Sequence, residues 1–343
     1  MRLSYRKFDL QLKHPFRIAI AARTFTPLVL IEIEKNGWIG RGECSMPPYL
    51  GESQDTAFAF YQLVEKSGIL QNVNLNSIDI KFIMSAIDAL QEGHSAAKAA
   101  IDIALHDLKG QIEQKPVWQM LGSEPMVMPV TSFTLGIDTP SVLREKIGGA
   151  ANFSAIKVKL GSENDYEIIE TICSVTDKPI YADANQGWKD VHFAIEMCHW
   201  LASKGVVLIE QPLPKSDLEG NAKVTEGSPI PILADESFQR FKDFSKIAGA
   251  FHGINIKLMK STGLCEAKQM VDEARKRKMK IMIGCMSETS CGTMAGAALA
   301  PQCDFADLDG PWLTVNNPYE TPILRGGKIE LSNNFGLGIK QLL

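Results

Sequence analysis

The sequence lacks several features that mark whole classes of protein. No apolar stretch approaches the roughly 20 residues that cross a bilayer, and MRLSYRKFDLQL at the start lacks the apolar core of a signal peptide. The one dense group of Lys and Arg, EARKRKMK (273–280), fits a helix end better than a nucleic-acid surface. From the missing membrane span and signal peptide we expect a cytoplasmic protein, and the formal net charge of −4 argues against a nucleic-acid or membrane partner.

Two further motifs are absent. The seven cysteines form no CxxC pair and fall mostly in apolar segments, as expected of reduced thiols packed in a core. Disulfide bonds and zinc sites are therefore not expected. No GxGxxG follows a strand-like run, so the fingerprint of a dinucleotide-binding fold is missing.

Residues 1–124 have the pattern of an α+β domain. LVLIEIEKNGWIGRGEC (28–44) contains two strand-like runs separated by the turn KNG. The Ala-rich segment 95–122 has helical spacing, and we expect its helix to stop at Gly110 and Pro116.

Residues 125–314 repeat one pattern: a short apolar run, a polar residue at its end, then an amphipathic helix. Such alternation indicates a parallel sheet covered by helices. Eight repeats in under 200 residues fit a closed TIM-like barrel better than the alternative, an open doubly wound sheet. Residues 315–343 are expected to return to the first domain. The eight runs are MPVTSFTLGI, AIKVKLG, PIYADAN, VVLIEQPL, PILADES, GINIKLMK, IMIGCMSE and FADLDGPW.

Acidic residues end three successive runs: Asp183 in ADANQG, Glu210 in LIEQPL and Asp235 in LADES. They are 27 and 25 residues apart, and Lys257 follows 22 residues later. Each separation is about one repeat, so we expect these side chains at one level of the barrel mouth. A single acid here could simply cap the following helix, but capping does not explain the whole series.

Three carboxylates in one cavity need a counter-charge, because desolvated like charges raise each other's pKa. Oxygen ligands without nearby His or Cys favour Mg²⁺, with Mn²⁺ as a substitute, over zinc. Asp183, Glu210 and Asp235 are therefore predicted to hold Mg²⁺. For Asn185 two roles are equally compatible with the sequence. Its side chain contacts the ion or a water bound to the ion, or it only packs against its neighbours.

Lysines are predicted on both sides of this ion. Side chains alternate along a strand, so Lys157 and Lys159 in AIKVKLG point into the barrel. Lys159 on one side and Lys257 on the other suit removal of a proton from one face of a carbon and its return to the other. Burial beside cations lowers the pKa of a lysine towards the working pH, as a base requires. Lys157 is predicted to supply one such cation and to pair with a bound anion.

These motifs together resemble the muconate lactonizing subgroup of the enolase superfamily. The resemblance implies a (β/α)7β barrel, a capping domain built from both chain ends, Mg²⁺ on the three carboxylates, and Lys159 and Lys257 as the acid/base pair. STG (261–263) departs from the usual double glycine. The resemblance rests on KVK (157–159), DAN (183–185), EQP (210–212), DES (235–237) and NIKLMKSTG (255–263), with SAAKAAIDIALHDLKGQ similar to the last capping-domain helix.

The last strand discriminates within the subgroup. FADLDGP presents Asp307 and Asp309 on one interior face, which resembles the feature of dipeptide epimerases that binds the substrate's α-ammonium group. A buried ammonium needs paired acceptors, whereas an acylated amine or a dicarboxylate would meet uncompensated negative charge. The alternatives are an o-succinylbenzoate synthase, an N-acylamino acid racemase, or a non-catalytic metal-binding barrel.

The segment PFRIAIAARTF (15–25) resembles that of Ala-Glu epimerases, which carry an arginine near the position of Ile20. By spacing from Pro15, Arg23 lies three positions too late to replace it. An apolar wall at Ile20 would leave a glutamate carboxylate unpaired. The predicted substrate is therefore a dipeptide with a small or hydrophobic second residue, such as Ala-Ala or Ala-Val.

Other residues are expected around the substrate. Thr134, Cys285 and Met286 are predicted to line the cavity. The loop MPPYLGES (46–53), with Tyr49, is the predicted lid. The sequence is compatible with a homo-oligomer.

Overall fold

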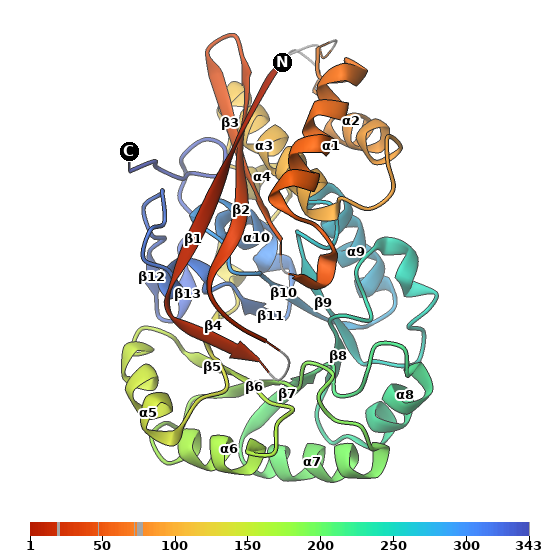
Figure 1. The fold of residues 1–343 in the computed structure, drawn as a ribbon, viewed down its shortest axis with the longest axis vertical. Helices are drawn as coiled ribbons and strands as arrows, with labels where there is room; N and C mark the ends of the chain where they lie inside the picture. Colours follow the sequence, from red (N-terminus) through yellow and green to blue (C-terminus); the bar gives the residue numbers. More distant parts are fainter. Residues whose placement is uncertain (19–20, 47, 72, 74–77, 343) are drawn as a thin grey trace.

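The computed structural model describes residues 1–343 except 19–20, 47, 72, 74–77 and 343. Its first part is an antiparallel sheet of order β1-β2-β3, against which α1 and α3 pack (Figure 1). The turn between β2 and β3 uses Asn36 and Gly37, whose φ angles of 52° and 83° are those of the hairpin that KNG predicts. The elements are β1 (Arg2–Ile18), β2 (Ala21–Lys35), β3 (Trp38–Ser45), η1 (Pro48–Leu50), α1 (Gln54–Ser67), α2 (Ile80–Asp88), α3 (Ser95–Glu113) and α4 (Val117–Met120).

Helix α3 does not stop at Gly110, so that part of the prediction was wrong, but it does end before Pro116. The helix continues to Glu113 and ends at Gln114, whose φ of 54° is left-handed. A Cβ on Gly110 would lie 2.7 Å from the Cα of Gly336, so this glycine permits close approach of the tail. Leu337 N–H donates to Asp107 on α3 at 2.8 Å, so the tail contacts this helix.

The second part is a barrel of eight parallel strands in chain order, β4 to β11. A bridge between Thr131 and Ala306 brings β11 back beside β4, which closes the sheet. Each of the eight predicted runs overlaps one strand, so the predicted fold class is confirmed. The strands are β4 (Ser132–Leu135), β5 (Ala155–Lys159), β6 (Ile180–Asp183), β7 (Val206–Glu210), β8 (Ile232–Ala234), β9 (Gly253–Lys257), β10 (Lys280–Gly284) and β11 (Phe305–Asp307).

Helices surround this barrel with one exception (Figure 1). Between β8 and β9 the chain, which is fully described there, forms only the 3-10 helix η4 (Phe241–Phe244) where the repeat predicts an amphipathic helix. Phe244 and Ile247 are buried in this segment and belong to the hydrophobic core. The other elements are η3 (Pro125–Val127), α5 (Pro140–Gly149), α6 (Asp165–Cys173), α7 (Val191–Ser203), α8 (Leu218–Gly227), α9 (Leu264–Lys276), α10 (Ser290–Leu299), η5 (Ala300–Gln302), η6 (Gly310–Leu313), β12 (Leu324–Arg325) and β13 (Lys328–Ile329).

The antiparallel sheet reaches the carboxyl ends of the barrel strands at two places. Ile137 N–H, just after β4, donates to Arg17 O on β1 at 3.0 Å. Ser45 Oγ on β3 donates to Ser287 O after β10 at 2.8 Å. The barrel mouth is therefore covered. Within the described residues all seven cysteines are free, and none of the helices is long and apolar enough to cross a membrane.

Candidate active site

Asp183, Glu210 and Asp235 come together at the barrel mouth. Asp183 and Glu210 are register partners at the ends of β6 and β7, and Asp235 directly follows β8. Each offers one carboxylate oxygen, and the three oxygens lie within 4.8 Å of one another. All three residues are buried. This arrangement is compact enough for one divalent ion.

Lys157 and Lys159 approach these carboxylates from β5, and both point into the barrel as strand alternation predicts. Lys157 Nζ lies 2.7 Å from Glu210 Oε1 and 3.3 Å from Asp183 Oδ2. Lys159 Nζ lies 2.6 Å from Asp183 Oδ2. Both lysines are buried, so these ion pairs are shielded from water.

Lys257 approaches from β9, and its Nζ lies 2.7 Å from Asp235 Oδ2. In the strand order, β6, β7 and β8 lie between β5 and β9, so Lys159 and Lys257 flank the three acids. Lys260 was missed, although its buried Nζ lies 2.5 Å from Asp235 Oδ1. Its position three residues after Lys257 could have indicated this contact. Lys260 N–H donates to Lys257 O at 2.9 Å, and in such a turn side chains three residues apart point in a similar direction.

The protein's own groups do not lower the pKa of Lys257. Burial lowers this pKa, but the combined attraction of neighbouring groups, Asp235 foremost, outweighs burial, and the net pKa lies well above the ordinary value. The same balance, with Asp307 and Glu210 as the main anions, raises the pKa of Lys157.

Three more oxygen atoms around the carboxylates are buried without a hydrogen-bond partner in the described residues: Asn185 Oδ1, Glu236 Oε2 and Asn255 Oδ1. Unpaired buried oxygens are rare and suit a cation or its water. The three clustered carboxylates themselves are an oxygen-only set that fits Mg²⁺. Glu236 was missed because it follows Asp235, and strand alternation would point it elsewhere. However, β8 ends at Ala234, so alternation no longer applies.

Asp307 and Asp309 line the same cavity, on and just after β11. Asp307 accepts hydrogen bonds from Lys157 Nζ at 2.7 Å and Ser132 Oγ at 2.8 Å. Asp309 accepts the Thr134 N–H at 2.6 Å and pairs with no cation in the described part of the chain. Burial and the neighbouring Asp307 raise the pKa of Asp309 to about 7. Asp309, with Asp307 beside it, can therefore accept a cation.

A single cavity joins these groups. Thr134, Cys285 and Met286 line it as predicted, and so does Tyr49 of the predicted lid, whose hydroxyl contacts Met286 Sδ at 3.1 Å. The complete lining is Phe16, Ala22, Arg23, Tyr49, Thr134, Lys157, Lys159, Asn185, Asp235, Glu236, Lys257, Cys285, Met286, Ser287, Asp307, Asp309 and Leu313.

Arg23 also lines this cavity, which its spacing from Pro15 did not predict. Arg23 is the register partner of Phe16, so the β1–β2 pair carries it over the mouth. Its Nη2 donates to Ser287 Oγ at 2.8 Å, its Nε is buried without a partner, and no carboxylate of the described residues pairs with it. Burial lowers the pKa of Arg23. Ile20, the predicted wall, lies outside the described residues.

Comparisons with known families match most of the chain. Residues 4–122 match the mandelate racemase / muconate lactonizing enzyme N-terminal domain, and residues 143–341 match the enolase C-terminal domain-like family. The chain is 47% identical over 347 residues to an L-Ala-D/L-Glu epimerase of Bacteroides thetaiotaomicron, with 100% of this chain and 88% of that protein covered.

Solved structures agree with these matches. The chain is similar to a substrate-liganded L-Ala-D/L-Glu epimerase from Bacillus subtilis, with 28% identity and a TM-score of 0.91 over 99% of this chain and 98% of that one. It is also similar to a dipeptide epimerase from Enterococcus faecalis in complex with Mg and L-Leu-L-Tyr. Here the identity is 32% and the TM-score 0.89, with 99% of each chain covered.

Proposed function

The chain belongs to the mandelate racemase / muconate lactonizing enzyme family, and on this premise we propose that it is a dipeptide epimerase, an isomerase that inverts the Cα of the second residue. One observation carries the proposal: Lys159 and Lys257 enter one cavity from opposite sides of three clustered carboxylates. Such a pair can work on both faces of a single carbon.

The substrate's ends would be held by charge. Asp309, buried without a cation partner in the described chain, and Asp307 beside it suit the α-ammonium group. Lys157, next to Asp307 and Glu210, suits the substrate carboxylate. A Mg²⁺ ion held by the acidic trio would neutralise the negative charge that develops on this carboxylate, and would weaken the attraction that keeps Lys257 protonated.

The proton is transferred by the two lysines. One of Lys159 and Lys257, in its neutral form, removes the Cα proton, and the other, as an ammonium, donates a proton to the opposite face. The lysines exchange roles for the other isomer. The free amine that the aspartates need makes an o-succinylbenzoate synthase or an N-acylamino acid racemase a poorer fit.

Proton NMR in D₂O tests this function. With Mg²⁺ and pools of Ala-Xaa dipeptides, we expect deuterium to enter the Cα of the second residue with loss of chirality there. The same dipeptides with an acetylated amine should not react, because Asp307 and Asp309 would then face a neutral group. If no Ala-Xaa pool exchanges, or if acetylated substrates exchange equally well, the assignment is wrong.

We further propose that the second residue is acidic, as in Ala-Glu. The partly buried guanidinium of Arg23, which no carboxylate of the described chain neutralises, is the feature that supports this choice, because a partly desolvated cation is stabilised by an anionic ligand. A small or hydrophobic second residue, predicted from Ile20, is the second candidate. Phe16 and Leu313, which give the same cavity an apolar surface, favour it.

Arg23→Met distinguishes these candidates. Loss of a charge-assisted pair is expected to lower kcat/KM for Ala-Glu by about 10- to 100-fold, while kcat/KM for Ala-Leu is unchanged or higher. The matched control is Arg17→Met on the same strand pair, since Arg17 is exposed and pairs with Asp138. Equal losses for both dipeptides would show that Arg23 does not select the acidic side chain, and a higher kcat/KM for Ala-Leu than for Ala-Glu in the unmodified protein would favour the hydrophobic candidate.

A further inference from the structure

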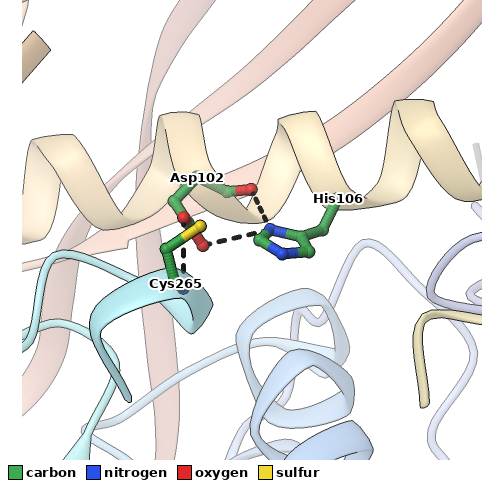
Figure 2. A group of neighbouring side chains, drawn as sticks. All are labelled: Asp102, His106 and Cys265. Carbon is green, nitrogen blue, oxygen red and sulfur yellow. Dashed lines mark hydrogen bonds and ion pairs between the residues drawn. The ribbon is translucent and has the colours of Figure 1, made fainter. Parts of the chain in front are cut away.

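Asp102 and His106 of α3 meet Cys265 of α9 in a cluster outside the cavity, and Figure 2 shows the three side chains converging between the two helices. One ligand atom from each lies within 4.8 Å of the others, as in a metal site. The hydrogen bonds indicate a different role. His106 Nδ1 lies 2.9 Å from Asp102 O, and a carbonyl oxygen only accepts, so Nδ1 carries a proton and has no lone pair for a metal.

The Asp102 carboxylate instead binds the start of α9. It accepts the Leu264 N–H at 2.5 Å and the Cys265 N–H at 3.3 Å, and the protonated His106 Nδ1 lies 3.2 Å from the same carboxylate. An anion at a helix N-terminus is stabilised by these amides and by the helix dipole. Because Asp102 is fully buried, the contact fixes α9 against the antiparallel part of the protein.

Asp102 also packs closely against Gly263, the residue before Leu264. A Cβ on Gly263, whose φ is 109°, would lie 2.4 Å from Asp102 Cβ. No side chain therefore fits between Asp102 and the chain at this point. The position of the loop just before α9 is thus set by α3.

That loop carries Lys257. Ser261 N–H donates to Lys257 O at 3.1 Å, and Gly263 N–H donates to Leu258 O at 3.0 Å. The backbone of Lys257 is thereby hydrogen-bonded to the segment that Asp102 holds. Lys159 is anchored differently: the Gly161 N–H donates to Asp165 at 3.0 Å, within the barrel itself.

We propose that Asp102 is a positioning residue that sets the place of Lys257, and not that of Lys159, from the capping helix α3. The inference rests on the proposed two-lysine function. On this proposal the position of Lys257 depends on α3, whereas the position of Lys159 depends on the barrel alone.

The test adds Asp102→Asn to two backgrounds and follows Cα deuterium exchange in D₂O with Mg²⁺. In Lys159→Ala only Lys257 can exchange the proton of its isomer, and in Lys257→Ala only Lys159 can do so. Displacement of a catalytic group costs about tenfold or more, so we expect about a tenfold loss in the Lys159→Ala background and less than about twofold in the other. Equal losses in both, or no loss in either, would overturn the role of Asp102.

Further variants keep the test interpretable if Asp102→Asn folds poorly. His106→Phe removes one donor to the carboxylate and should show the same asymmetry, to a smaller extent. The matched control is Asp217→Asn, because Asp217 caps helix α8 through the Gly220 N–H at 2.8 Å and should leave both backgrounds alike. If the single lysine variants show no exchange before Asp102 is changed, the two-lysine function itself fails, and the role of Asp102 falls with it.

Discussion

Replacing either Lys159 or Lys257 by alanine is expected to lower kcat for epimerisation by about 10³-fold or more. General acid and base groups each contribute about 10²- to 10⁴-fold, and inversion needs both in every turnover, so either loss stops the same reaction. The measurement is polarimetry or proton NMR of each dipeptide isomer with saturating Mg²⁺.

A folding control is needed for these lysine variants, since Lys159→Ala leaves Asp183 without its 2.6 Å ion pair and Lys257→Ala does the same to Asp235. Circular dichroism and thermal unfolding separate misfolding from lost chemistry. The matched control is Lys223→Ala, since Lys223 pairs with Glu219 on the exposed face of α8. A non-catalytic metal-binding barrel predicts that both buried lysines can be replaced with no functional loss.

Removing divalent cations with EDTA is expected to abolish epimerisation, and Mg²⁺ or Mn²⁺ should restore it. The fold should survive, because Lys157, Lys159, Lys257 and Lys260 already balance the carboxylates. A ligand that binds only the native state adds about 2.7 kcal/mol at 100 times its Kd. Mg²⁺ should therefore also raise Tm, which provides a readout independent of activity.

Glu210→Gln should lose both the activity and the Mg²⁺-dependent rise in Tm. The amide keeps the shape of the side chain but removes the negative charge that a hard cation requires. The exposed Asp272, paired with Lys268 on α9, offers the control Asp272→Asn. Full activity in EDTA, or a Tm of Glu210→Gln that still rises with Mg²⁺, would show that this trio is not the metal site.

Local patterns in the sequence were enough to predict the barrel and the charged residues at its mouth. A regular strand alternates its side chains, so the inward direction of Lys157 and Lys159 follows from their positions alone. Repeats of nearly equal length place Asp183, Glu210 and Asp235 at one level of a closed sheet. The domain boundaries at 124 and 314, and the catalytic roles of these residues, stay predictions.

The residues that were missed lie where these regularities end. Glu236 and Lys260 come after the last residue of a strand, so alternation does not fix their direction. Arg23 reaches the cavity because β1 and β2 carry it across the mouth, which spacing from Pro15 does not reveal.

The sequence by itself therefore determined the barrel, its charged ring and the side of each strand that faces inward, because these depend on periodicity along a chain. Only the tertiary structure decided that Arg23 enters the cavity and that Asp102 holds the start of α9. Both depend on where one part of the chain crosses another, and residues 162 positions apart, such as Asp102 and Leu264, share no local pattern that records their contact.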